Sequence, residues 1–237
     1  GWGEIVRMLA DRPIEQADLT RHLRRGGRLV IISGPPMTAT GWTSLGLEGK
    51  TPEPDLRDHG TAIFARLETA EGPTTIWGWD WPSDPSRGRM SFVQPSRAAL
   101  RDSTHVRFAP TPAGPMRRSS EAGFPPPEIV VGDFNTARRS AAIKQLLPDL
   151  SSAHAQAGIG PDYGWPRMLR IRGTDRATIP FLGLDQAFID VHRWRATAYR
   201  MIDMGEGTHR AQEVMLTRVR STPEAPARPA PGRGASE

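Results

Sequence analysis

The sequence predicts a mixed α/β fold with a strand-rich C-terminal part. Two short, uninterrupted apolar runs, at residues 29–32 and 129–131, are typical of strands that are buried on both faces. Segments with a helical spacing of apolar residues lie close to each run, at 15–25 and 138–147. Helical and strand-like segments that alternate in this way indicate an α/β domain.

The expected elements follow one another in a regular order. The helix at 15–25 ends at Gly26-Gly27, which suit a helix C-terminus. The predicted strands cover residues 29–32, 61–67, 74–81, 129–131, 182–191, 195–202 and 210–219, and the predicted helices cover 15–25, 96–102 and 138–147. Trp77, Trp79 and Trp81 alternate along one strand, so we expect them in the core, with the wall of a cleft as the alternative.

The length suits one domain. The chain has 237 residues and a mass of 26.0 kDa. We expect the domain at residues 1–220 and a disordered tail at 221–237, because the tail is rich in Pro and Ala and has no large apolar residue. Residues 108–127, rich in Pro, Gly and Ser, are predicted to form a surface loop.

Composition narrows the classes of function. The absence of cysteine excludes disulfides, zinc–thiolate sites and cysteine nucleophiles. The net charge is +5, but Lys50 and Lys144 are the only lysines, and this arginine bias is typical of a GC-rich genome. No block of five or more like charges occurs, so the charge pattern does not support nucleic-acid binding. No apolar run reaches the ~20 residues of a bilayer-spanning helix, so no membrane span is predicted in this chain.

The sharpest local feature is Gly132-Asp133-Phe134-Asn135, which follows the apolar run at 129–131. In extended geometry, Asp133 and Asn135 project to the same side of the chain. Such a pair suits phosphate chemistry, in which the carboxylate orients a water or a metal and the amide donates to a phosphate oxygen. The alternative is structural: an Asx turn in which Asp133 caps the helix that begins near Arg138.

Two later features complete a pattern. Asp185 opens an apolar segment, and His209 lies just before the last predicted strand. In this order the residues resemble the endonuclease/exonuclease/phosphatase superfamily. Its members carry a Gly-Asp-Phe-Asn, then an Asp that opens a strand, and finally a Ser-Asp-His before the last strand. The resemblance covers residues 29–219, and the segments 59–66, 79–85 and 158–166 agree with it.

The resemblance implies a DNase I-like α/β fold, in which two β-sheets pack face to face with helices outside each. It also implies hydrolysis of phosphate esters assisted by Mg²⁺ or Mn²⁺. The catalytic residues it implies are Asp133, Asn135, Asp185 and His209, and the implied substrate contacts are Asn135, Trp165 and Arg210.

The resemblance also implies a role for each catalytic residue. Asp133 would activate the attacking water, and Asn135 would hold the phosphate. His209 would stabilise the charged phosphate oxygens, and Asp185 would orient His209. A carboxylate behind an imidazole fixes its tautomer and favours its protonated form.

Several departures from the family pattern concern the metal. The carboxylate before the final histidine is replaced by Thr208, and the metal-binding glutamate after the second strand is replaced near Gly34. In the segment 79–85, Asp80 stands where the family has a histidine. The metal ligands then expected are Asp133 and Asp80, in a shifted site. The first strand of the fold has no recognisable counterpart, and we expect it to be missing from this chain.

Three hypotheses follow. The first is an active, metal-dependent phosphodiesterase or phosphatase. The second is a degenerate member that binds a phosphate ligand or has a regulatory role without turnover, and the sequence leaves these two open. The third, a basic nucleic-acid-binding domain, is disfavoured by the four-residue set. We expect a monomer. A membrane-anchored parent, as in some bacterial relatives, stays open because the chain begins with Gly1 rather than Met.

Overall fold

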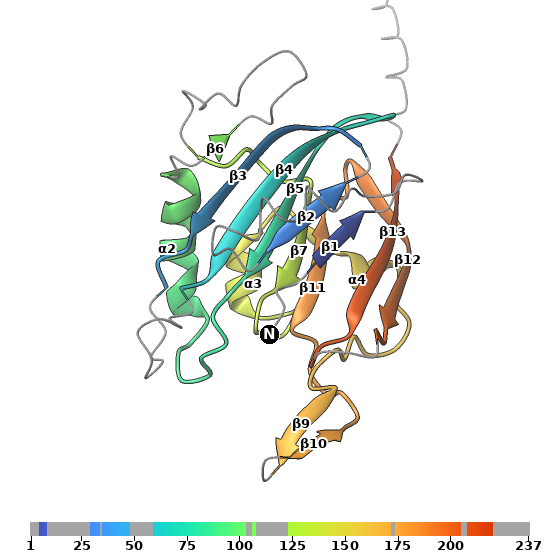
Figure 1. The fold of residues 1–237 in the computed structure, drawn as a ribbon. Coiled ribbons are helices and arrows are strands. Elements are labelled where there is room, and N and C mark those ends of the chain that lie inside the picture. Colours follow the sequence, from blue (N-terminus) through green and yellow to red (C-terminus); the bar gives the residue numbers. More distant parts are fainter. Residues whose placement is uncertain are drawn as a thin grey trace, which may run out of the picture.

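A computed structural model describes residues 5–8, 29–33, 35–47, 59–102, 106–107, 123–171, 174–204 and 208–219. Its centre is a seven-stranded mixed sheet with the order β6-β3-β4-β5-β7-β11-β8 (Figure 1). The strands are β3 (Met37–Ser44), β4 (Thr61–Thr69), β5 (Gly72–Asp80), β6 (Val106–Arg107), β7 (Ile129–Asp133), β8 (Ser151–Ser152) and β11 (Asp185–Ile189). β5 and β7 run parallel, whereas β7 and β11 run antiparallel.

One face of this sheet packs against the helices α2 (Met90–Arg101) and α3 (Ala141–Leu146). Trp77 and Trp79 of β5, and Trp81 just after it, belong to this core, as expected: Trp79 and Trp81 are completely buried and Trp77 almost so. Trp79 stacks on Phe134, with ring centroids 5.9 Å apart. Trp81 donates a hydrogen bond to the Ser96 hydroxyl of α2 over 3.1 Å, which satisfies its buried indole N–H.

The other face of the sheet packs against a second layer of strands. This layer contains β2 (Val30–Ser33) and the antiparallel pair β12 (Trp194–Ile202) and β13 (Ala211–Arg218). Ile76, Ile129 and Ile189 of the large sheet share one apolar cluster with Ala196 and Leu216 of this pair. The short helix α4 (Ala153–Ala157) joins the cluster through Ala153. The fold is therefore α/β with two layers of strands, as predicted.

A short strand lies upstream of β2. β1 (Ile5–Met8) lies parallel to β2, with Ile5 opposite Val30 (Figure 1). A strand therefore precedes β2 in this chain, but it does not carry the asparagine that the resemblance implies for the first strand. The segment is four residues long and contains Arg7, so its apolar pattern is too short to indicate a strand, and its pairing with β2 depends on tertiary structure.

The predicted helix at 15–25 and the predicted tail at 221–237 lie outside the described residues, as does most of the predicted loop at 108–127. The helix expected at 96–102 begins earlier, at Met90, and contains Pro95. Burial of Phe92 and Val93 stabilises the turns before the proline. The helix expected at 138–147 is shorter, because Ser140 forms its N-cap.

Some strands gave no clear sequence signal. β3 is rich in Thr and has few large apolar residues, so its alternating burial was not evident from the sequence. β9 (Met168–Ile171) and β10 (Thr174–Ala177) form a hairpin that extends from the body of the fold (Figure 1). Among the described residues, no helix is long and apolar enough to cross a membrane.

The glycine of the Gly-Asp-Phe-Asn motif generates a first prediction. A Cβ atom at Gly132, where φ is 150°, would lie 1.9 Å from the backbone oxygen of Trp79 on the neighbouring strand. Gly132→Ala must therefore push β5 and β7 apart, and we expect it to lower the free energy of unfolding by about 3 kcal/mol or more. Urea denaturation measures this change. The matched control is Gly88→Ala, because a Cβ there meets nothing within 4 Å. An equal effect of both substitutions would contradict the prediction.

Candidate functional site

Three aspartates stand side by side at one edge of the large sheet. Asp80 ends β5, Asp133 ends β7 and Asp185 begins β11. The strand register pairs Asp80 with Asp133 and Asp133 with Asp185. Each aspartate lies four residues from an isoleucine on the same strand, and these isoleucines, Ile76, Ile129 and Ile189, pack against the second layer of strands. Residues an even number apart on a strand point to the same face of the sheet. The three aspartates are therefore on the face that the second layer of strands covers.

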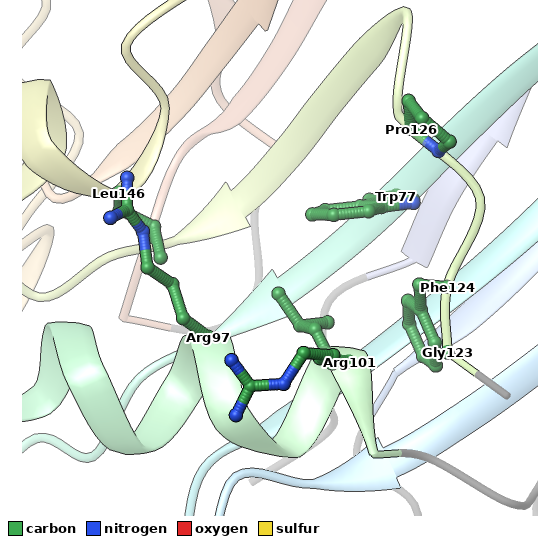
Figure 2. Close-up of a pocket in the computed structure, with 8 residues that line it drawn as sticks. Trp77, Arg97, Arg101, Gly123, Phe124, Pro126 and Leu146 are labelled. Atoms are coloured by element: carbon green, nitrogen blue, oxygen red, sulfur yellow. The ribbon is translucent and has the colours of Figure 1, made fainter.

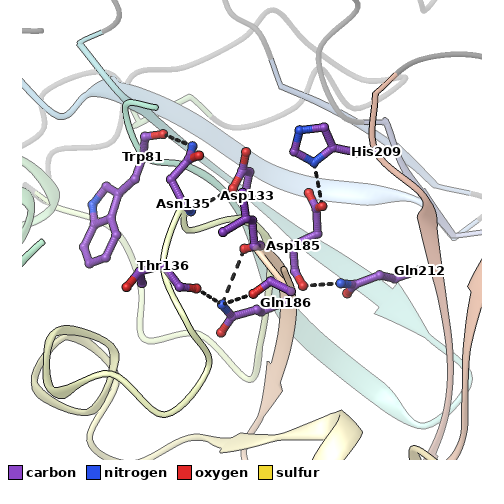
Figure 3. A network of polar contacts seen from close by, with 10 residues as sticks. Trp81, Asp133, Asn135, Thr136, Asp185, Gln186, His209 and Gln212 are labelled. Atoms are coloured by element: carbon purple, nitrogen blue, oxygen red, sulfur yellow. Dashed lines mark hydrogen bonds and ion pairs between the residues drawn. The ribbon is translucent and has the colours of Figure 1, made fainter. Parts of the chain in front are cut away.

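His209 joins two of these aspartates from the second layer. It lies two residues before β13, and its Nδ1 is 2.7 Å from Oδ2 of Asp185 (Figure 3). The Gln212 side chain donates a hydrogen bond to the backbone oxygen of Asp185, which ties β13 to the start of β11. One side-chain ligand atom from each of Asp133, Asp185 and His209 lies within 4.8 Å of the others. Residues 76 positions apart in the sequence thus form one polar cluster.

Asp133 and Asn135 meet through a turn rather than through an extended strand. β7 ends at Asp133, and Asn135 has a φ of 46°, in the left-handed region. The Asn135 backbone N–H donates to Oδ1 of Asp133 over 2.7 Å, and the Asn135 side-chain amide donates to the backbone oxygen of Trp81 over 2.7 Å. The Asx turn that we considered as an alternative is present. Asp133 does not cap α3, however, because Ser140 accepts from the Ile143 N–H.

Burial and charge shift the pKa values of this cluster. Desolvation, followed by the charge of Asp185, raises the pKa of Asp133 to about 7, against the opposing effect of the Asn135 hydrogen bond. Burial alone would lower the pKa of His209. The hydrogen bond and the negative charge of Asp185 outweigh burial, with further contributions from Asp133 and Asp80, so the pKa of His209 is raised. Both groups therefore keep their proton to a higher pH in the folded protein than in the unfolded chain.

The predicted substrate contacts lie beside His209. The Trp165 ring centroid is 6.3 Å from that of His209, and the two rings are tilted by 50°. The Arg210 backbone N–H donates to the Gly164 oxygen over 3.0 Å, which joins the two segments. The buried Nε of Arg210 has no hydrogen-bond partner in the part of the chain that the structure describes. Both residues are half-buried.

The positions expected to carry the metal are only partly brought together. Asp80 is in register with Asp133 but is not part of the group whose ligand atoms converge. Thr208 is exposed and offers a neutral hydroxyl, and Gly34 lies outside the described residues.

Two residues of this region had no sequence signal. Gln212 lies within a strand, and nothing in its neighbourhood suggested a contact with Asp185. The Arg89 guanidinium donates to the backbone oxygen of Asn135 over 2.8 Å, although 46 residues separate the two. Backbone oxygens are present in every residue, so contacts to them leave no trace in composition or spacing.

A cavity of about 380 Å³ lies elsewhere (Figure 2). Trp77, Leu100, Phe124 and Leu146 form part of its lining, together with the side chains of Arg97 and Arg101. Trp77 belongs to the core on the helical face of β5, whereas Asp80 lies on the opposite face. The cavity and the aspartates are therefore on opposite faces of the sheet.

Comparisons with known proteins give a likeness of fold. No family model matches the sequence, and no curated protein shows significant similarity to it. Three of the solved structures that match are a protein of unknown function from Enterococcus faecalis, a mannosyl-6-phosphatase from Bacteroides thetaiotaomicron, and an endonuclease/exonuclease/phosphatase family protein from the latter species. The sequence identities are 13%, 11% and 9%, and the TM-scores are 0.49, 0.45 and 0.47. The matches cover 77%, 76% and 76% of this chain and 68%, 67% and 65% of those chains. They include the superfamily that the sequence motifs resemble.

The raised pKa values generate a prediction about stability. At pH values between the unfolded pKa of 3.8 and the folded pKa of about 7, Asp133 is protonated to a greater extent in the folded state than in the unfolded state. Its contribution to stability is therefore complete below pH 3.8 and is lost as the pH rises through about 7, and His209 has the same sign. In buffer with EDTA, we expect Asp133→Asn to raise the free energy of unfolding at pH 8 by about 1 kcal/mol or more.

Chemical denaturation at pH 5 and pH 8 checks this sign. The control is Asp149→Asn, which removes an exposed carboxylate outside the cluster and should leave the difference between the two pH values as in the wild type. A lower free energy of unfolding at pH 8 in Asp133→Asn than in the wild type would contradict the desolvation cost assigned to the Asp133 carboxylate.

Proposed function

We propose that this chain is a metal-dependent phosphoester hydrolase of the endonuclease/exonuclease/phosphatase superfamily. The observation that carries the proposal is the convergence of Asp133, Asp185 and His209 within 4.8 Å, with His209 hydrogen-bonded to Asp185. The order of these residues in the sequence supports the same reaction class. A carboxylate beside a carboxylate–imidazole pair suits attack of water on a phosphoester, because proton acceptor and charge stabiliser are both present.

Each residue has a distinct role in this proposal. Asp133 accepts a proton from the attacking water, which its place beside Asp185 and His209 allows. Asp185 fixes the His209 ring through Nδ1, which leaves Nε2 to donate to a phosphate oxygen. The raised pKa of His209 favours the imidazolium form that this donation requires. The Asn135 side-chain amide has a second hydrogen beyond the one given to Trp81, and this hydrogen is suited to the phosphate.

The residues present fit a divalent cation. Asp133 and Asp185 place two carboxylates against each other, and burial and mutual repulsion raise the pKa of Asp133. Mg²⁺ or Mn²⁺ prefers hard oxygen donors, and a cation held by Asp133 would offset the negative charge of its carboxylate. Asp133 would hold it, with Asp80 on the neighbouring strand as the second candidate ligand. The cation would supply charge stabilisation for the phosphate oxygens.

A second candidate function is supported by the departures from the family pattern. Thr208 is neutral, Gly34 has no side chain, and Asp80 stands outside the converging group. A site with fewer carboxylates holds Mg²⁺ less tightly. The alternative is therefore a phosphate-ligand-binding module without turnover, and an activity measurement separates the two.

The first test is hydrolysis of bis-p-nitrophenyl phosphate with Mg²⁺ or Mn²⁺. We expect turnover that depends on the metal and falls about 100-fold or more in His209→Ala, because the charge that faces the phosphate is lost. The control His192→Ala removes an exposed histidine of the turn before β12 and should retain activity. If the wild type binds inorganic phosphate but shows no turnover, the binding-module alternative is favoured.

Calorimetric titration with Mn²⁺ tests the metal ligands. We expect one site whose affinity falls about 10-fold or more in Asp133→Asn, because a first ligand is removed. Asp80→Asn decides the second ligand: an equal loss would make Asp80 a ligand, whereas unchanged affinity would exclude it. Asp149→Asn is again the control for the removal of one negative charge. The absence of any binding heat in the wild type would contradict the metal proposal.

A further inference from the structure

Arg89 connects the start of α2 to the turn that carries Asn135. Its Nε donates to the Asn135 backbone oxygen over 2.8 Å. One of its terminal nitrogens donates to the backbone oxygens of Asp84 and Arg87 over 2.7 and 3.2 Å. The side chain is half-buried, and its guanidinium carbon lies 5.2 Å from the centroid of the Phe92 ring. One side chain thus binds three backbone oxygens from two separate segments.

The chemistry of the contact requires a guanidinium. A planar guanidinium presents donors in fixed directions, whereas a lysine ammonium is a single nitrogen on a flexible stem. Only the planar group can hold the Asn135 oxygen on one edge and the turn at residues 84–87 on another. The Phe92 ring below it restricts where the group can lie.

The turn at Asn135 needs such support. A non-glycine residue in the left-handed region is uncommon, even for Asn, which adopts it more readily than most, and its surroundings must hold it there. Asn135 is held at three points: its N–H by Asp133, its side chain by Trp81 and its backbone oxygen by Arg89. Its N–H is also the donor that fixes Oδ1 of Asp133. The Arg89 contact is therefore two steps from the carboxylate of the site.

We infer that Arg89 is a positioning residue of this site. It fixes the backbone of the Asn135 turn and thereby the direction of the Asp133 carboxylate, without touching the substrate. The catalytic consequence rests on the proposed function, whereas the structural consequence does not. The two can therefore be tested separately.

The structural test measures amide hydrogen exchange by NMR in wild type and Arg89→Met. We expect the Asn135 amide to exchange at least tenfold faster in Arg89→Met. The reference is the Glu128 amide, which donates to Thr75 at the far end of β7 and should be unchanged. The matched control is Arg87→Met, which also removes one positive charge. The guanidinium carbon of Arg87, like that of Arg89, lies near the Phe92 ring, 4.8 Å from its centroid.

The outcomes are distinct. Faster exchange at Asn135 alone, and only in the Arg89 variant, supports the inference. Unchanged exchange at Asn135, or equal acceleration at Glu128, overturns it, since Arg89 would then be dispensable or a general stabiliser. Arg89→Lys should not restore protection, and full restoration would overturn the requirement for the planar group.

The catalytic arm uses bis-p-nitrophenyl phosphate. With an active wild type, we expect Arg89→Met to lower kcat about tenfold, because Asp133 is misdirected, and to raise KM, because the Asn135 amide that faces the phosphate belongs to the same turn. An unchanged kcat would overturn the positioning role. If the wild type itself shows no turnover, the proposed function fails, while the exchange experiment still decides the role of Arg89.

Discussion

The register of β5, β7 and β11 places Asp80, Asp133 and Asp185 next to one another, and the rest of the site depends on this arrangement. Like charges opposite each other on a sheet repel, and burial adds a desolvation cost. The fold must therefore supply compensation. His209 does so from the second layer of strands, by its hydrogen bond to Asp185, and the raised pKa of Asp133 expresses the part that remains uncompensated.

The close approach of β5 and β7 and the turn after β7 serve the same arrangement. Gly132 permits the contact with Trp79 that brings the strand ends together. Beyond Asp133 the chain leaves the sheet through Asn135, whose left-handed conformation is held by hydrogen bonds from distant parts of the chain. On the helical face of the sheet, Phe134 of the same turn stacks on Trp79, and this packing stabilises the turn. A polar site on one face thus depends on an aromatic core on the other.

Much of the fold could be predicted because it depends on local pattern. The apolar run at 129–131 is short and uninterrupted, as is typical of a buried strand, and the alternation of Trp77 and Trp79 in β5 matches the two-residue period of a strand; both segments are buried strands. The prediction failed where the pattern was weak. β1 is too short, β3 has few large side chains, and the helix α2 continues through Pro95 because Phe92 and Val93 are buried before it. In each case a tertiary contact outweighs a local preference.

The sequence by itself determined the identity and order of Asp133, Asn135, Asp185 and His209, because chain order is retained whatever the fold. It also excluded thiolate chemistry, since there is no cysteine. Only the tertiary structure decided which of these side chains meet, which nitrogen of His209 faces Asp185, and that Asp80 remains outside the converging group. The physical reason is that strand register and backbone hydrogen bonds, such as those of Arg89 and Gln212, join residues far apart in the chain.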